Sequence, residues 1–428
     1  MITKVGHIIG YLLIFLGLSE LVPIIAAFVF NESGLVLPFF ICSMLTIFIG
    51  LGLCFAFPDH DEQPSRYDII FFLILVWVLL PIFASIPFMV SGTLTKFTDA
   101  YFEATSAFTT TGSTMLANSA LAPKAILFWR ALLQWLGGLF LFVLAVSVLP
   151  LSAIGGSELY RSTLPHGEKE GFVSRVKSAI KPLSTIYVGL TILCIILLRT
   201  SGMGFFDAMS TSMATLSSGG FTNHANSGVN SFSNWNEFIL IPFMIIAATN
   251  LTYHWSFITS GKLRAYQYDR ELKYFFAITF VSTLIVFVTL IGAENASSSS
   301  LFKKLGLSVF TAVSALSTTG FLPDGAHTMS LGIVIMCIIL MFVGGSMGSS
   351  AGGFKIMRFK VLFRQADSEI SRLAHPHGIV PMRVNDMNVT NSMLMGIWTL
   401  LFLYLSTIAL FSIIYGLLGY DMGVGIGL

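Results

Sequence analysis

Charged side chains are scarce in this sequence. Only 10% of its 428 residues are Asp, Glu, Lys or Arg, whereas 55% are hydrophobic. A water-soluble domain carries about 25% charged residues, so this composition excludes a soluble protein of two or three domains. It indicates a chain that crosses a lipid bilayer many times. The net charge of +2 gives no reason to expect a nucleic-acid partner.

Cysteine is also rare, and catalytic or metal-binding motifs are few. The four cysteines all lie inside apolar runs, where a thiol behaves as a small hydrophobic group: Cys42, Cys54, Cys194 and Cys337. Four dispersed cysteines in a chain of this length do not form a disulfide framework, and no CxxC pair is present to ligate zinc. His375 and His377 have no Cys or acid at ligand spacing, and no HExxH motif is present. A membrane-embedded enzyme therefore remains only as an alternative.

Long apolar runs, by contrast, are abundant. A spanning helix needs about 20 predominantly apolar residues. We predict spans at Val5–Phe30, Leu35–Phe57, Ile69–Met89, Ala125–Leu149, Pro182–Leu198, Phe238–Ile258, Phe275–Ile291 and Met393–Leu418. Polar, basic loops are expected at Pro150–Lys181 and around Lys262–Lys273, and a basic helix at Phe354–Phe363.

Three shorter, semi-polar segments lie between these spans and end at a glycine. They are Asp99–Thr114, Phe206–Gly219 and Gly306–Thr319. Asp99 lies thirteen residues before Gly112, and Asp207 lies thirteen residues before Gly220, whereas the third copy has Leu307 at the matching place before Gly320. Each segment predicts a half-membrane helix that leads into a loop. Because non-helical backbone at membrane depth is tolerated only where it is buried in protein or lines a cavity, three such loops indicate a pore.

The loops have the chemistry that a dehydrated monovalent cation needs. Backbone carbonyls and hydroxyls replace its water shell without a fixed charge, and the C-terminal end of a short helix adds a partial negative charge. The alternative is that these small residues form helix–helix contacts. The predicted cation-binding residues are Thr110, Thr111, Gly112, Ser218, Gly219, Gly220, Thr318, Thr319 and Gly320.

A run of glycine and serine, Gly344–Gly353, interrupts the apolar segment Ser330–Val343 at its end. We interpret this run as a flexible loop beneath the glycine segments that gates the pore. A hinge or turn that closes a helical hairpin is the alternative. The residues assigned to this gating loop are Gly344, Gly345, Ser346, Gly348, Ser349, Ser350, Gly352 and Gly353.

Two charged residues fall inside predicted spans. Arg130 either contributes to the electrostatic field of the pore or snorkels to the membrane interface. Glu20 either has a polar partner or lies beside a kink at Pro23. Outside the spans, five Lys or Arg residues lie on the side of the glycine loops and seventeen on the other side. The positive-inside rule then places the N-terminus in the cytoplasm. The loops all fall on one side, as in a pore rather than a carrier with inverted repeats.

With these motifs in place, the sequence resembles the Trk/Ktr/HKT superfamily of potassium transporters, and most closely the TrkH type of bacterial uptake subunit. The resemblance covers essentially the whole chain. It is carried by Thr109–Ser113, Ser218–Thr222, Thr318–Phe321, Leu127–Pro150 and Gly344–Lys355.

The resemblance implies an all-α membrane protein with span–pore-helix–span repeats around a pseudo-fourfold pore, after two extra N-terminal helices. It implies one filter glycine per repeat, here Gly112, Gly220 and Gly320, with potassium as substrate and no covalently bound cofactor. It also implies a homodimer in the bacterial inner membrane and a cytosolic TrkA-type nucleotide-binding partner, through which alone nucleotides would act. The basic segments at Lys169–Lys181, Lys262–Lys273 and Lys355–Arg372 are candidate contacts for that partner.

The expected organisation is a two-helix domain at residues 1–67, repeats at 68–155, 156–268 and 269–385, and an incomplete fourth repeat at 386–428. After Asp421, the thirteen-residue spacing would place a fourth glycine beyond the last residue, Leu428. We therefore expect a truncated sequence whose three-quarter pore does not conduct selectively by itself. The alternatives are a non-conducting remnant and a sodium/potassium-type transporter of the same superfamily.

Overall fold

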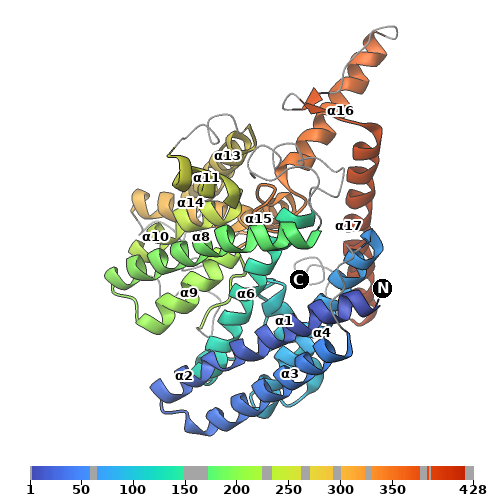
Figure 1. Ribbon diagram of the computed structural model, residues 1–428. Helices are drawn as coiled ribbons and strands as arrows, with labels where there is room; N and C mark the ends of the chain where they lie inside the picture. Colours follow the sequence, from blue (N-terminus) through green and yellow to red (C-terminus); the bar gives the residue numbers. More distant parts are fainter. Residues whose placement is uncertain are drawn as a thin grey trace.

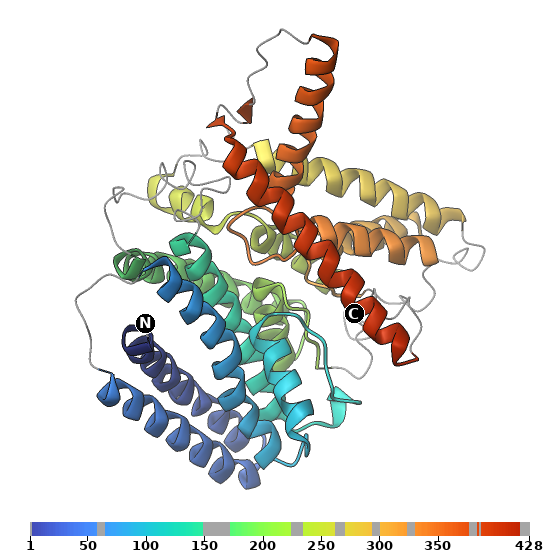
Figure 2. The ribbon, with the colours of Figure 1, turned by 90° about the vertical axis from the view of Figure 1, so that its right-hand side faces the viewer.

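The structure is a computed structural model that describes residues 2–57, 65–148, 172–223, 234–261, 270–292, 300–322, 330–375, 383–384 and 387–419. Almost all of these residues are helical, as expected. Among them, the only sheet is a two-residue hairpin of β1 (Arg383–Val384) and β2 (Met387–Asn388). The helices pack side by side in one body, from which α16 projects (Figures 1 and 2).

The first unit is a pair of N-terminal helices. Its elements are α1 (Ile2–Glu20), α2 (Val22–Val29), η1 (Ser33–Leu35) and α3 (Val36–Ala56). α1 packs closely on α3 because Gly10 and Gly50 lie at the crossing, where a Cβ on either would overlap the opposite backbone. Glu20 is fully buried and accepts a hydrogen bond from the Thr46 hydroxyl at 3.2 Å, so it has the polar partner expected.

The second unit contains α4 (Arg66–Val90), α5 (Phe97–Phe108), η2 (Ser119–Leu121) and α6 (Lys124–Val148). Asp99 lies in the first turn of α5, as predicted. α6 is the central helix, since it packs against α2, α4, α5, α8 and α9. Its first two backbone N–H groups donate to the carboxylate of Glu32 at 2.7 and 2.9 Å, which fixes α6 to the N-terminal pair.

Two predictions for the next region were wrong. α8 (Phe172–Thr200) begins ten residues before the predicted span at Pro182, because its first three turns are polar yet helical. The predicted span Phe238–Ile258 is two helices, α10 (Asn234–Ala248) and α11 (Leu251–Ser260), bent by 100°. Asn250 is the N-cap of α11 and accepts from the N–H of Thr252 at 3.0 Å, so a helix start lies inside the apolar run. Between α8 and α10 lies the short helix α9 (Phe205–Ser217), with Asp207 in its first turn.

The third unit contains α13 (Arg270–Gly292), α14 (Leu301–Leu316) and α15 (Leu331–Val343). α13 includes Arg270 and Lys273, which were assigned to a loop. α14 begins five residues before the predicted Gly306, because Ser300 caps it by accepting from the N–H of Phe302 at 3.3 Å. The shared packing of α10 and α14 joins this unit to the preceding one.

The last helices are less enclosed. α16 (Ile356–Ala374) extends well beyond the predicted Phe363, and its far end is exposed at Ile370 and Leu373. α17 (Asn391–Leu417) runs along the outside of the body (Figure 2). Only 6% of the most apolar stretch of this helix is buried inside the protein.

Seven helices among the described residues are long and apolar enough to cross a membrane, or eight if α10 and α11 count as one. α5, α9 and α14 are too short for this, as the sequence predicted. The protein is therefore a multi-pass membrane protein. Of the predicted repeat boundaries, three (155/156, 268/269 and 385/386) lie outside the described residues, and the repeat assignment stays a prediction.

Candidate functional site

The three short helices end in the same way. At the end of α5, the N–H of Thr110 donates to the Ala107 carbonyl, and the N–H of Thr111 donates to the Ser106 carbonyl at 2.9 Å. The same pair of bonds ends α9 at Ser218 and Gly219, and ends α14 at Thr318 and Thr319. This is the Schellman arrangement, in which a left-handed residue stops a helix and satisfies its last carbonyls. Glycine normally takes that position, but this chain has threonine or serine there.

The residues that follow share one backbone pattern. The left-handed residue has φ of 57° at Thr110 and 55° at both Ser218 and Thr318. Two residues later comes a glycine, with φ of 83° at Gly112, 71° at Gly220 and 74° at Gly320. A left-handed residue with a side chain costs about 1–3 kcal/mol and persists where the surroundings impose it. The residue between them (Thr111, Gly219 or Thr319) does not have a positive φ, so the sign of φ alternates along each segment. We call Thr110–Gly112, Ser218–Gly220 and Thr318–Gly320 the glycine segments.

The glycine segments lie next to one another in chain order. A Cβ at Gly112 would overlap the carbonyl oxygen of Gly219, and a Cβ at Gly220 would overlap the carbonyl oxygen of Thr319. The two contacts are equivalent. In each, the glycine of one segment lies against the carbonyl of the residue that precedes the glycine of the next segment. A Cβ at Gly320 would meet only the Met341 Cε, at 3.9 Å, among the described residues.

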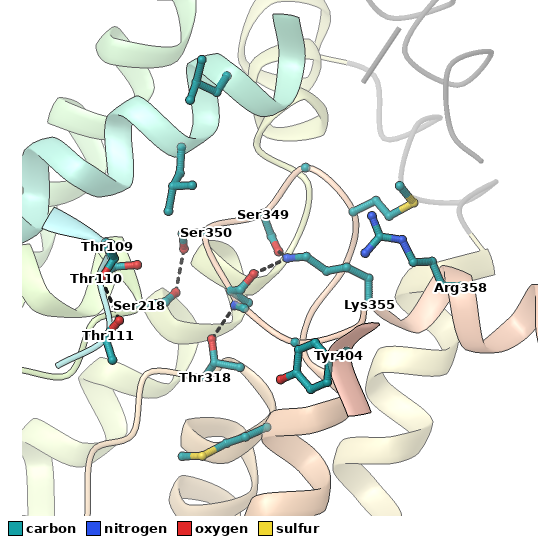
Figure 3. Close-up of a pocket in the computed structure, with 18 of the residues that line it drawn as sticks. Thr109, Thr110, Thr111, Ser218, Thr318, Ser349, Ser350, Lys355, Arg358 and Tyr404 are labelled. Atoms are coloured by element: carbon teal, nitrogen blue, oxygen red, sulfur yellow. Dashed lines mark hydrogen bonds between the residues drawn. The ribbon is translucent and has the colours of Figure 1, made fainter. Parts of the chain in front are cut away.

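One end of the glycine segments opens into a cavity of about 680 Å³. Part of the predicted cation site lines it: Thr110, Thr111, Ser218 and Thr318, with Thr109 beside them (Figure 3). Part of the predicted gating loop lines it as well: Gly348, Ser349, Ser350, Gly352 and Gly353. The other predicted residues lie off the cavity wall: Gly112, Gly219, Gly220, Thr319, Gly320, Gly344, Gly345 and Ser346.

The loop Gly344–Gly353 is non-helical and docks on the break between α10 and α11. The N–H of Ser346 donates to the Ala248 carbonyl at 2.9 Å, and the N–H of Ser350 donates to the Ala247 carbonyl at 3.1 Å. In return, the N–H of Leu251 donates to the Gly348 carbonyl at 3.5 Å. Because the bent helix and the loop satisfy each other's backbone groups, both irregular segments are tolerated inside the protein.

The same loop also bonds to two glycine segments. The hydroxyls of Ser218 and Ser350 lie 2.6 Å apart, and the N–H of Gly352 donates to the Thr318 hydroxyl at 2.6 Å (Figure 3). We call these two bonds the loop contacts. They account for the side chain at the left-handed position of the second and third segments, since glycine has no hydroxyl to offer.

Charged groups also hold the loop, and one of them, Lys355, lines the cavity. The Lys355 ammonium donates to the Ala351 carbonyl and to the Ser349 hydroxyl (Figure 3). The carboxylate of Glu271 on α13 also holds the loop, since it accepts from the N–H of Met347 at 3.0 Å. Residues Gly344–Gly348 match the letters of a GxSxG motif, but they connect two helices, whereas the catalytic elbow needs a strand before the turn.

The opposite end of the first two glycine segments contains a buried ion pair. Glu103 on α5 and Arg130 on α6 are 0% and 1% exposed, with Oε1 and Nη1 3.3 Å apart. The interpretation that Arg130 snorkels to the interface was therefore wrong. α6 also supports the segments with Gln134, whose amide packs on Gly219, and with Gly137, which leaves room for the Phe108 carbonyl.

Metal-binding clusters are absent from the described part of the chain, where no three His, Cys, Asp or Glu residues come together. His375 is the last residue of the described range 330–375, and His377 lies outside the described residues. All four cysteines are free.

The chain is similar to known transport proteins. A sequence profile named TrkH, described as "Cation transport protein", matches residues 37–418. The "Trk system potassium uptake protein TrkH" of Vibrio parahaemolyticus is 32% identical over 92% of this chain and 81% of its own length. The protein of that name from Escherichia coli is likewise 32% identical, over the same shares of the two chains. The E. coli "Trk system potassium uptake protein TrkG" is 31% identical over 98% of this chain and 86% of its own length.

A solved structure gives the same result. The crystal structure of the potassium transporter TrkH from Vibrio parahaemolyticus superposes with a TM-score of 0.90 at 29% sequence identity. The match covers 100% of this chain and 88% of that one.

Proposed function

The chain belongs to the TrkH family of cation transport proteins, and from this premise we propose that it carries potassium ions across the bacterial inner membrane. Potassium uptake is the function named for its relatives from V. parahaemolyticus and E. coli. The family is one of transporters, which sets aside the alternative of a membrane enzyme.

The observation that carries this proposal is the threefold recurrence of one backbone pattern at adjacent places. Each glycine segment follows a short helix and has left-handed residues two positions apart. Backbone carbonyls in such segments, with the negative ends of three helix dipoles behind them, suit a desolvated monovalent cation. The glycine segments are accordingly the filter segments of this proposal, and their nine residues are the potassium-binding residues.

The loop Gly344–Gly353 is the gate in this proposal. It lines the same cavity as Thr110, Ser218 and Thr318, and the two loop contacts bond it to the filter. Separating the loop from the filter then requires that two neutral hydrogen bonds exchange partners, at a net cost of about 1 kcal/mol each. The closed position is thus stable but reversible.

The orientation and the partner follow from charge and shape. The excess of Lys and Arg on the side away from the glycine segments favours a cytoplasmic N-terminus. α16 projects on the loop side of the molecule and carries Lys360, Arg364 and Arg372 (Figure 1). We assign it to contact with a cytosolic TrkA-type subunit, through which nucleotides act, and we expect a homodimer in the membrane.

The function is tested by growth of potassium-uptake-deficient bacteria at low potassium, together with ion uptake into liposomes that contain the purified full chain. We expect growth rescue and uptake of potassium over sodium. Selective uptake by the purified chain would contradict the expectation, drawn above from the incomplete fourth repeat, that this chain does not conduct selectively by itself. Gly112→Ser and Gly220→Ser should abolish rescue, since a side chain at either place overlaps a backbone carbonyl. Equal uptake of both ions would favour a sodium/potassium-type transporter, and an absence of uptake would contradict the proposal.

A further inference from the structure

The buried pair of Glu103 and Arg130 connects two filter segments. The Glu103 carboxylate accepts from the Thr114 hydroxyl at 2.9 Å and from the N–H of Met115 at 2.7 Å, in addition to Arg130. Arg130 extends its second terminal nitrogen to the Thr222 carbonyl at 2.6 Å. One short helix, two chain segments and α6 are thereby linked by one pair of charges.

The positions that Arg130 reaches are equivalent in the two repeats. Thr114 lies two residues after Gly112, and Thr222 lies two residues after Gly220. Nη1 of Arg130 donates to the Thr114 hydroxyl at 3.3 Å, while Nη2 donates to the Thr222 carbonyl. The guanidinium also lies over the Phe221 ring, 4.4 Å from its centroid. A planar group with divergent donors can bridge two such points, whereas an ammonium cannot.

We propose that Arg130 and Glu103 are positioning residues that set the spacing of the first two filter segments and thereby determine potassium selectivity. This inference rests on the proposed function. Selectivity depends on the number and placement of carbonyl oxygens around the ion, and a fixed bridge two residues beyond each glycine limits how far those oxygens can move. We call the linked set of Glu103, Arg130, Thr114 and Thr222 the charged clamp.

The pair acts through geometry rather than through its field. Both side chains are buried and opposite in charge, and both carboxylate oxygens of Glu103 accept hydrogen bonds. No comparable charged bridge joins the second and third filter segments within the described residues. In the third repeat, the Ser314 hydroxyl on α14 donates to the Phe321 carbonyl at 2.8 Å, a neutral bond within one repeat.

The test compares Arg130→Lys with the unchanged chain, both as the full chain in liposomes with potassium and sodium uptake measured separately. Lys keeps the charge beside Glu103 but cannot also reach the Thr222 carbonyl. We expect the potassium-to-sodium uptake ratio to fall by about tenfold, which corresponds to ~1.4 kcal/mol, mainly through increased sodium uptake. Arg199→Lys is the matched control, because Arg199 is exposed on α8 and also donates to a backbone carbonyl, that of Met203, at 2.8 Å. It should leave the ratio unchanged.

A second variant and a binding measurement cover the case in which Arg130→Lys does not fold. Thr114→Val removes a hydroxyl from the clamp and should lower the ratio in the same direction by a smaller factor. Potassium binding is followed separately, as the rise in melting temperature in potassium relative to sodium. Both variants should reduce this difference.

The outcomes separate the two proposals. If the unchanged chain shows neither selective uptake nor stabilisation by potassium, the proposed function fails and this inference fails with it. If the unchanged chain is selective, but the folded variants keep its uptake ratio within about twofold, equivalent to ~0.4 kcal/mol, the positioning role alone is wrong. A fall in the ratio for Arg199→Lys would also overturn it, because the effect would then not be specific to the clamp.

Discussion

The two ends of the filter are held by different chemistry. At one end, the charged clamp joins the first two segments through a buried ion pair. At the other end, the loop contacts join the second and third segments to the loop Gly344–Gly353 through neutral hydroxyls and one backbone N–H. Removing one member of a buried ion pair costs about 3–5 kcal/mol, whereas a neutral hydrogen bond contributes about 1 kcal/mol. The clamp end is therefore built to stay in place, and the loop end is built to exchange partners.

The largest expected effect comes from the clamp end. Glu103→Gln removes the charge that compensates buried Arg130, so the free energy of unfolding should fall by about 3–5 kcal/mol. The measurement is thermal unfolding of the purified chain in detergent. Glu369→Gln is the control, since Glu369 forms an exposed pair with Arg372 at 3.0 Å that is expected to contribute less than about 1 kcal/mol. If both variants lowered the free energy of unfolding equally, the buried ion pair would contribute no more than the exposed one, and this prediction would be wrong.

The next effect distinguishes the filter segments from one another. Gly220→Ala places a methyl group against the Thr319 carbonyl, whereas Gly320→Ala meets only the Met341 methyl at 3.9 Å. Both changes strain a left-handed residue by about 1 kcal/mol, but only the first also forces two segments apart, at a further cost of about 1–3 kcal/mol. Potassium uptake should therefore fall more for Gly220→Ala. If Gly320→Ala lowered potassium uptake as much as Gly220→Ala, contact between neighbouring segments would not explain the effect.

The smallest effect belongs to the loop end. Ser350→Ala removes the hydroxyl that contacts Ser218 and also donates to the Ala247 carbonyl at 3.0 Å. Loss of the contact with Ser218 should weaken the closed state by about 1 kcal/mol, equivalent to roughly a fivefold shift toward open. Basal uptake measured without a partner subunit should rise accordingly, with little change in melting temperature. Thr318→Ser keeps the acceptor for the N–H of Gly352 and should behave like the unchanged chain. A fall in uptake for Ser350→Ala would show that this contact supports the filter rather than closing the gate.

Much of the fold could be predicted from local patterns. The long apolar runs gave the spans, and the thirteen-residue spacing from Asp99 and Asp207 located two of the three glycines at which left-handed backbone occurs. These features depend on residues close in sequence, so a linear pattern contains them. In the sequence, the bend between α10 and α11 is indicated only by Asn250, a single polar residue within an apolar run. The mean hydropathy of about 20 residues hardly changes with one polar residue, so it does not reveal the bend.

The clamp and the loop contacts could not be predicted in the same way. Glu103 and Arg130 are 27 residues apart, and Ser218 and Ser350 are 132 apart. Their meeting depends on how α5, α6 and α9 pack. Arg130 alone in an apolar run fits a snorkelling residue as well as a paired one, and only the position of Glu103 decides between them. A serine or threonine where a helix stop normally has glycine is the one signal in the sequence that pointed to the loop contacts.

The break between α10 and α11 has a consequence for hydration. Ala247 and Ala248 present carbonyls that the loop occupies, and the loop in turn presents the Gly348 carbonyl to Leu251. If the loop leaves, each of these groups needs a new partner, and inside the protein that partner is a neighbouring polar side chain or water. In the gating that we propose, opening therefore goes together with wetting of the cavity: a change that dries the cavity favours the closed loop, and a change that admits water favours the open one.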